Sequence, residues 1–203
     1  MINDGLPKKK KNQTWIFVTF ETPYTTQNTY GSFQFDWTMS YRHDADVFSP
    51  YGIIKIRSSP KGKDYASIYS RKTHNVVWIA SNCNTVSKRK SYVLQLAKHI
   101  DVDIYGRCGH FSCPGTLFEC KKKLSEKYKF ILSFENSLCK DYMTEKIFSI
   151  YGDDVNIIPI VRGAPNVALE SAKKAHEKQK EQYDLKVRGT VVEKGVTVLG
   201  KDC

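Results

Sequence analysis

Charged and polar side chains gather in one short segment of this sequence. Glu135, Asn136, Tyr142, Glu145 and Lys146 all lie within it. A carboxylate can accept two hydrogen bonds from the hydroxyls of a ribose, and a lysine ammonium can pair with a phosphate. These residue types suit a nucleoside diphosphate, with Glu135 or Glu145 on the ribose and Lys146 on the phosphates.

A second positive charge for such a ligand stands upstream, at Arg89. Arg89 opens a predicted helix, and helix N-termini offer free N–H groups and a partial positive charge to anions. No glycine-rich phosphate loop occurs, which excludes a Walker site and a Rossmann fingerprint. An ordinary alternative stays open, because Glu145 and Lys146 would also suit an ion pair on a helix surface.

The pattern of apolar residues predicts the elements that position these side chains. Strands are predicted over 75–80, 102–105, 129–134 and 155–161, and helices over 88–100, 117–128 and 142–150. Alternating strands and helices favour an α/β fold with a parallel sheet, in which ligands bind beyond the carboxyl ends of the strands. We therefore expect the loops that follow the strands to form one cleft.

The two longer helices of this unit carry more detailed expectations. The first should bury an apolar stripe with helical spacing, made of Val93, Leu96, Ala97 and Ile100. The second should turn Lys121, Lys122 and Lys123 towards solvent.

Outside the α/β unit the pattern is weaker. Residues 14–20 are predicted to form a buried strand that leads to Glu21, and residues 52–56 a strand-like piece. Residues 170–186 have good helix propensity but almost no apolar stripe, so an exposed helix is expected there. Residues 190–199 are compatible with a hairpin.

One string of the sequence is more specific than its separate residues. Residues 128–146, YKFILSFENSLCKDYMTEK, resemble the donor-site signature of the α-1,3-fucosyltransferase family, glycosyltransferase family 10. The resemblance continues through WIASNC with Arg89 and Tyr92, through VDIYGRCG and through WTMSYRHDADVFSPYG. It reaches FETP, where Thr22 replaces the family's serine, and covers about residues 14–166.

The resemblance implies a GT-B-like α/β fold, with a parallel-sheet donor lobe and, in this chain, an incomplete acceptor lobe. The expected organisation is a basic leader, a partial acceptor-side lobe, a GDP-fucose-binding lobe and a divergent charged tail. These parts cover residues 1–13, 14–74, 75–166 and 167–203. Since the family normally has more sequence before FETP, the chain is expected to be an incomplete copy that transfers fucose poorly or not at all.

The implied activity is an inverting transfer of fucose from GDP-fucose to N-acetylglucosamine of a glycan, in α-1,3 linkage, without a metal or other cofactor. The resemblance implies protein glycosylation on the lumenal side of the Golgi membrane, although the sequence shows no membrane anchor or signal. The alternative is a catalytically inactive fragment that still binds the nucleotide sugar.

Carried over position by position, the resemblance also assigns site residues. Arg89 and Lys146 would bind the pyrophosphate, Glu145 the ribose, Asn136 and Tyr142 would shape the donor pocket, and Glu21 would be the general base. An inverting transfer needs a carboxylate to take the acceptor's proton on the face opposite the departing GDP.

The formal net charge of +11 favours an anionic partner. A nucleic acid is the competing candidate, but the sequence contains no recognition motif for one, so no nucleic-acid partner is expected. Asp44 and Asp46 have the spacing of a metal-dependent transferase site, yet a structural or solvated pair is the preferred interpretation. The same holds for His43 and His110.

Six cysteines are present, without a CxxC pair, which disfavours a zinc ribbon. Buried free thiols are one possibility. If the protein is made in a secretory lumen, at least one disulfide is expected among Cys83, Cys108, Cys113, Cys120 and Cys139.

Overall fold

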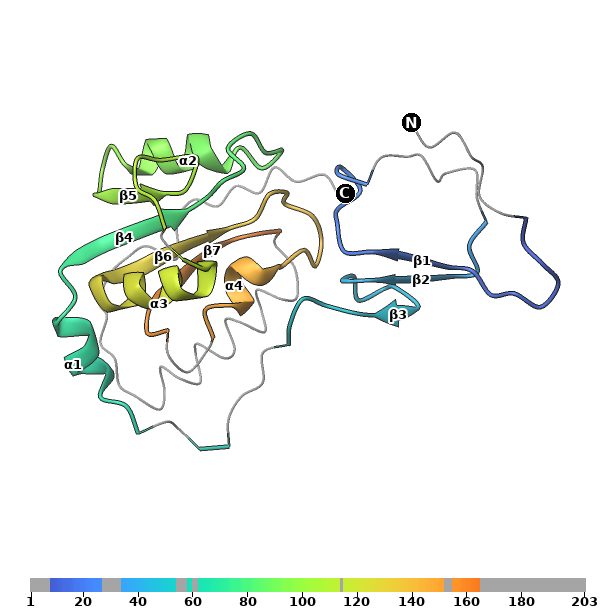
Figure 1. Ribbon diagram of the computed structural model, residues 1–203, viewed down its shortest axis with the longest axis horizontal. Coiled ribbons are helices and arrows are strands. Elements are labelled where there is room, and N and C mark those ends of the chain that lie inside the picture. The colour runs from blue at the N-terminus through green and yellow to red at the C-terminus, as the bar shows by residue number, and fades with distance from the viewer. Residues whose placement is uncertain are drawn as a thin grey trace.

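The computed structural model describes residues 8–26, 34–53, 58–59, 62–113, 115–151 and 155–164 of the 203-residue chain. Within these ranges the chain forms two separate parallel β-sheets (Figure 1). The α/β fold with parallel sheets is therefore confirmed. The helix predicted over 170–186, the hairpin predicted over 190–199 and the charged tail of 167–203 lie outside the described residues.

The larger sheet has four strands in the order β5-β4-β6-β7. Its strands are β4 (His74–Ile79), β5 (Val102–Tyr105), β6 (Tyr128–Phe134) and β7 (Ile158–Arg162). The helices around it are α1 (Tyr65–Ser70), α2 (Arg89–Leu96), α3 (Leu117–Lys127) and α4 (Glu145–Phe148). All neighbouring strands are parallel, so their carboxyl ends share one edge of the sheet.

The core of this unit lies on both faces of the sheet, because successive strand side chains point to opposite sides. Val76 and Trp78 of β4 pack with Val93 of α2 on one face. Val77 packs with Leu124 of α3 on the other face. Helices α2 and α3 accordingly cover opposite faces of the sheet (Figure 1).

The helix predicted over 88–100 is wrong in its length, because α2 ends at Leu96. Beyond that point the N–H groups of Lys98 and His99 bond to carbonyls three residues back, which tightens the last turn. Because of this tighter turn, Ile100, the last residue of the predicted apolar stripe, does not reach the core and is 41% exposed. Val93, by contrast, is fully buried as predicted.

The last strand also differs from its prediction. Strand β7 begins at Ile158, later than the predicted 155–161. Val155 and Ile157 are buried in the core cluster that also holds Leu124 of α3, and the pairing with β6 begins only at Ile158. An apolar run in a sequence therefore indicates that its residues are buried. It does not show which of them form hydrogen bonds with a neighbouring strand.

The smaller sheet holds β1 (Ile16–Thr19), β2 (Trp37–Ser40) and β3 (Val47–Phe48). The strand predicted over 14–20 is thus present as β1, but the prediction that it is buried was wrong, since Val18 is 51% exposed. In the described part of the chain no helix covers this sheet, which explains the exposure (Figure 1). Strands β2 and β3 were not predicted. The piece predicted over 52–56 is not a strand at Gly52 and Ile53, and its remainder is outside the described ranges.

Candidate functional site

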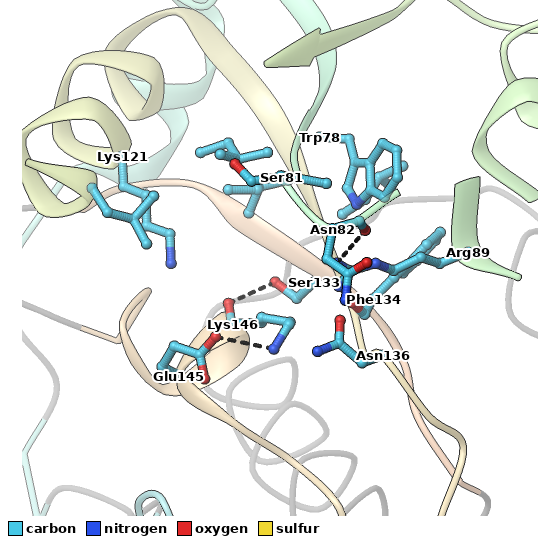
Figure 2. A pocket seen from close by; sticks show the side chains of 15 residues that line it. Trp78, Ser81, Asn82, Arg89, Lys121, Ser133, Phe134, Asn136, Glu145 and Lys146 are labelled. Carbon is cyan, nitrogen blue, oxygen red and sulfur yellow. Dashed lines mark hydrogen bonds and ion pairs between the residues drawn. The ribbon is translucent and has the colours of Figure 1, made fainter. Parts of the chain in front are cut away.

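A cavity of about 280 Å³ opens at the carboxyl edge of the larger sheet. It lies between the ends of β4 and β6 and the helices α3 and α4 (Figure 2). The polar and charged residues that argue for its chemistry are Asn82, Arg89, Lys121, Asn136, Glu145 and Lys146. Its volume is near the lower end of the roughly 300–1,000 Å³ typical of small-molecule sites.

Helix α4 is shorter than the predicted 142–150, and contacts around Asp141 and Thr144 fix its start. Asp141 adopts a left-handed backbone conformation with φ of 60°, which interrupts a helix before it can form. Thr144 then caps α4, and its side chain accepts the N–H of Lys146. The helix therefore begins where Glu145 and Lys146 can face the cavity.

Glu135 fixes this cap from inside the protein. Its carboxylate, 1% exposed, accepts the backbone N–H of Thr144 at 2.9 Å and also the Thr144 hydroxyl. Burial raises the pKa of Glu135, while the Lys146 ammonium, 3.3 Å away, acts in the opposite direction. Glu135 is therefore occupied in holding the backbone, and of the two candidate carboxylates it is Glu145 that lines the cavity.

Glu145 and Lys146 form an ion pair at the N-terminus of α4. The Lys146 ammonium lies 3.0 Å from Glu145 Oε1 (Figure 2). It also donates to the Thr144 hydroxyl at 2.8 Å. Burial alone would raise the pKa of Glu145, but Lys146 and Thr144 outweigh it and the pKa is lowered. Glu145 is thus held as an acceptor beside a full positive charge.

Arg89 occupies the opposite side of the cavity, at the start of α2. Its guanidinium donates to the carbonyls of Phe134 at 2.8 Å and Asn82 at 3.0 Å, and it lies over the Trp78 ring. Burial lowers its pKa, although Glu135 and Glu145 act against that shift. Its buried Nε has no hydrogen-bond partner among the described residues.

Asn136 completes the set at the cavity. Its Oδ1 is buried and has no partner within the described ranges. Arg89, from the segment after β4, is therefore brought together with Asn136, Glu145 and Lys146, from the segment after β6. Unsatisfied polar atoms of Arg89 and Asn136 in such a place suit a polar ligand, since buried polar groups are nearly always hydrogen-bonded.

Tyr142 and Glu21 do not line the cavity, but they lie against each other. The Tyr142 hydroxyl donates to Glu21 Oε2 at 3.0 Å, and so links the loop after β6 to the loop after β1. Burial first, and the Glu21 charge second, raise the pKa of Tyr142. Close by, the hydroxyls of Thr22 and Ser137 lie 3.3 Å apart in the buried junction of the same two loops.

The sequence prediction for Lys121 was wrong. Lys121 is only 5% exposed and lines the cavity from α3, whereas Lys122 and Lys123 are exposed as expected. The signal that could have found it is position on the helix, because Lys121 directly follows Cys120 and stands three residues before Leu124. These positions share one helix face, and Leu124 is buried in the core.

Two family models match the chain. One, described as glycosyltransferase family 10 (fucosyltransferase) C-term, matches residues 69–177, and the other, fucosyltransferase N-terminal, matches residues 2–52. The chain belongs to the glycosyltransferase family 10 fucosyltransferases. The larger match contains the whole four-stranded sheet and the cavity at its edge.

Curated relatives agree with this membership. Glycoprotein 3-alpha-L-fucosyltransferase A of Drosophila melanogaster is 38% identical over 164 residues, which is 78% of this chain and 32% of the relative. Alpha-(1,3)-fucosyltransferase C of the same fly is 35% identical, over 77% of this chain and 41% of its own length. Alpha-(1,3)-fucosyltransferase 4 of Mus musculus is 39% identical, over 67% and 32%. The chain thus spans between about a third and two fifths of these fucosyltransferases.

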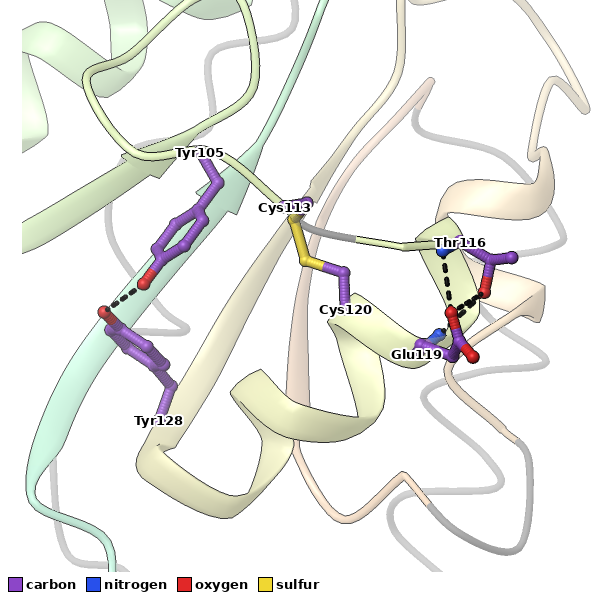
Figure 3. Close-up of a disulfide and its surroundings, with 6 residues drawn as sticks. All are labelled: Tyr105, Cys113, Thr116, Glu119, Cys120 and Tyr128. Carbon is purple, nitrogen blue, oxygen red and sulfur yellow. Dashed lines mark hydrogen bonds between the residues drawn. A yellow bond between two sulfur atoms is a disulfide. The ribbon is translucent and has the colours of Figure 1, made fainter.

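Two disulfides stabilise the loops around the cavity of this fucosyltransferase chain. Cys83–Cys108 links the loop after β4 to the loop after β5. Cys113–Cys120 ties the β5 loop to α3, whose start is set by a reciprocal capping box between Thr116 and Glu119 (Figure 3). The expectation of at least one disulfide in this set of cysteines agrees with the structure.

The other sequence candidates are engaged in local contacts. Asp44 forms a two-point ion pair with Arg42, which lowers the pKa of Asp44, and Asp46 accepts from the Thr38 N–H and hydroxyl. His43 stacks on Phe48. No cluster of metal-ligating side chains is found among the described residues, nor any helix long and apolar enough to cross a membrane.

Proposed function

We propose that this chain binds GDP-fucose in the cavity at the carboxyl edge of the larger sheet. The observation that carries the proposal is the meeting of Glu145 and Lys146, at the start of α4, with Arg89 around one cavity. Family membership and the names of the relatives support fucose as the transferred sugar.

In the proposed complex each cavity residue has a task that matches its chemistry. Lys146 and Arg89 face the diphosphate, and Glu145 accepts hydrogen bonds from the ribose hydroxyls. Asn136 uses its free Oδ1 to orient the donor. Negative charge grows on the diphosphate as the sugar leaves, and fixed cations stabilise a site most where charge develops. No metal ion is assigned a role in this mechanism.

We further propose that the whole enzyme transfers fucose with inversion to N-acetylglucosamine of a glycan, in α-1,3 linkage. An acceptor hydroxyl oxygen forms a bond to fucose C1 while the bond from C1 to GDP breaks, and the electron pair leaves with the diphosphate. Glu21 takes the hydroxyl proton. The hydrogen bond from Tyr142 supports this role, because it holds the Glu21 carboxylate beside the donor loop.

We also propose a GT-B arrangement for the whole enzyme, in which residues 14–74 and 75–166 supply parts of the two lobes. The proposed place of action is the lumenal side of the Golgi membrane, on glycoproteins. The alternative, a fragment that binds the nucleotide sugar without turnover, is distinguished by assaying both binding and transfer. Labelled fucose would be followed from GDP-fucose to glycans ending in N-acetylglucosamine, with Glu21→Gln as the inactive control.

The direct test of the donor site is isothermal titration of the purified chain with GDP and UDP. GDP is expected to bind at least about tenfold better. Lys146→Ala should weaken GDP binding by about 1–3 kcal/mol, because it removes a charge-assisted phosphate contact. Lys127→Ala, which changes an exposed lysine at the end of α3, is the matched control. Equal affinity for GDP and UDP would contradict the proposed donor.

A further inference from the structure

Lys121 is a buried cation that the proposed donor contacts do not use. It projects into the cavity from α3, on the side opposite Arg89 (Figure 2). Its ammonium donates to the hydroxyl of Ser149, and no carboxylate in the described part of the chain lies within ion-pair distance of it. Burial lowers its pKa, with Glu145 acting against the shift and Lys146 adding to it.

Such a placement is costly unless an acceptor completes it. An ammonium has three donors, and burying a charge with one neutral partner leaves much of its lost hydration uncompensated. The exposed Lys122 and Lys123 show that the same helix can present lysines to water. Lys121 is therefore suited to donate hydrogen bonds to a ligand in the cavity.

The order of residues around the cavity says which part of a nucleotide would meet Lys121. Ser149, its partner, donates to the carbonyl of Glu145, so Lys121 and Glu145 flank one end of the cavity. Lys146 and Asn136 lie between this end and Arg89 (Figure 2). With Lys146 and Arg89 on the phosphates and Glu145 on the ribose, the base extends towards Lys121.

We propose that Lys121 recognises the guanine base of the donor by donating hydrogen bonds to O6 and N7. This inference rests on the proposed function and adds to it the residue that selects the base. Guanine presents two acceptors at this edge, and lysine is a common partner for them. Adenine presents an amino donor in place of O6, which would face the ammonium unfavourably.

The test compares the affinities of GDP, IDP and ADP for the full chain and for Lys121→Met, by isothermal titration. IDP keeps O6 and N7, and ADP keeps the ribose and phosphates but lacks O6. The variant is expected to lower the affinity for GDP and IDP about tenfold, and to lower the GDP-to-ADP affinity ratio by a similar factor. Lys123→Met, an exposed lysine of the same helix, should leave the ratio unchanged. Thermal unfolding of each variant checks that it is folded.

The outcomes separate the inference from the function on which it rests. An unchanged GDP-to-ADP ratio in Lys121→Met would overturn the inference, whether all affinities fall in parallel, as for a phosphate contact, or none falls. If Lys146→Ala weakens GDP binding in the same experiment, the proposed function survives that result. A wild-type chain that binds no nucleotide would overturn both. Should Lys121→Met fail to fold, Lys121→Gln is measured, with the same ratio deciding.

Discussion

Glu135 and Glu145 belong to the same polar segment, yet they perform different tasks because the backbone turns between them. Glu135 is held inside the protein by Thr144, and Glu145 faces the cavity beside Lys146. Their pKa values shift in opposite directions because their surroundings differ. Burial raises the pKa of Glu135, whereas the Lys146 ammonium and the Thr144 hydroxyl outweigh burial at Glu145 and lower its pKa. Residue type alone could not separate them.

Tyr142 allows a pH test of its burial beside Glu21, since burial first and the Glu21 charge second raise its pKa. Its pKa is raised above 10.0 in the folded protein, so above that pH the folded state binds more protons than the unfolded state. The stability that Tyr142 contributes is fully present below pH 10.0 and is lost as the pH rises towards the folded-state pKa. The free energy of unfolding of wild type relative to Tyr142→Phe, measured in urea, should be constant below pH 10 and fall above it. Tyr24→Phe, which changes an exposed phenol, is the control, and a constant difference up to pH 11.5 would contradict the assignment.

At the scale of elements, the loops after the strands are set by backbone geometry that few residues can adopt. Gly106 closes β5 with φ of +85°, and a Cβ there would lie 2.6 Å from the carbonyl oxygen of Ala80. This carbonyl belongs to the loop after β4, at the cavity edge. The close approach of the two loops therefore depends on a residue without a side chain.

Gly106→Ala should destabilise the fold by about 2 kcal/mol or more, because it adds both strain at positive φ and a clash with backbone. Gly62→Ala is the matched control, since its Cβ would meet no atom within 4 Å. Urea unfolding followed by circular dichroism measures both. Similar effects of the two substitutions would show that the loop relaxes without cost.

The two disulfides that join described cysteines to each other should contribute unequally to stability. Cys83–Cys108 closes a separation of 25 residues and Cys113–Cys120 one of 7, and the entropy lost by the unfolded chain grows with loop length. Replacing the first pair by alanines should cost about 3–4 kcal/mol, and the second about 2–3 kcal/mol. Peptide mapping of secreted protein should recover both pairings. Free thiols at these four positions, or a larger loss from the shorter loop, would contradict this expectation.

At the scale of the whole molecule, the two sheets meet through the loops that carry Glu21 and Tyr142. Besides that pair, Thr22 and Ser137 bond in the buried junction, and the rings of Tyr41 and Tyr51 pack against the ring of Tyr142. The smaller sheet has no helical cover among the described residues, so these contacts connect it to the part of the chain that has a core.

A double-mutant cycle tests whether the two sheets unfold together. Thr22→Val and Ser137→Ala each remove one partner of the buried bond, and their coupling energy in the free energy of unfolding should be about 0.5–1.5 kcal/mol. The control cycle pairs Thr22→Val with Ser70→Ala, a distant exposed position, and should be additive. Coupling near zero for the first pair would mean that the small sheet unfolds independently.

The sequence by itself determined the parallel sheet, the order along the chain of its strands and of helices α2, α3 and α4, and three residues of the cavity, Arg89, Glu145 and Lys146. Each of these depends on local information: apolar runs of strand length, helical spacing, and polar residues between a strand and the helix that follows it. Helix α1 was not predicted, and Asn136 was assigned through the resemblance. Residue types alone indicated a nucleoside diphosphate, and the resemblance of residues 128–146 to the fucosyltransferase signature added the expectation that the ligand is GDP-fucose.

Only the tertiary structure decided which side chains are buried and at which residues the helices begin and end. Val18 is exposed because no described helix covers β1, whereas Lys121 is buried because its face of α3 lies over the cavity and the core. Helix α4 starts late because Glu135, from the end of β6, holds Thr144 in place. In each case the deciding contact comes from a segment distant in sequence or from beyond the local turn, and local patterns carry no information about such partners.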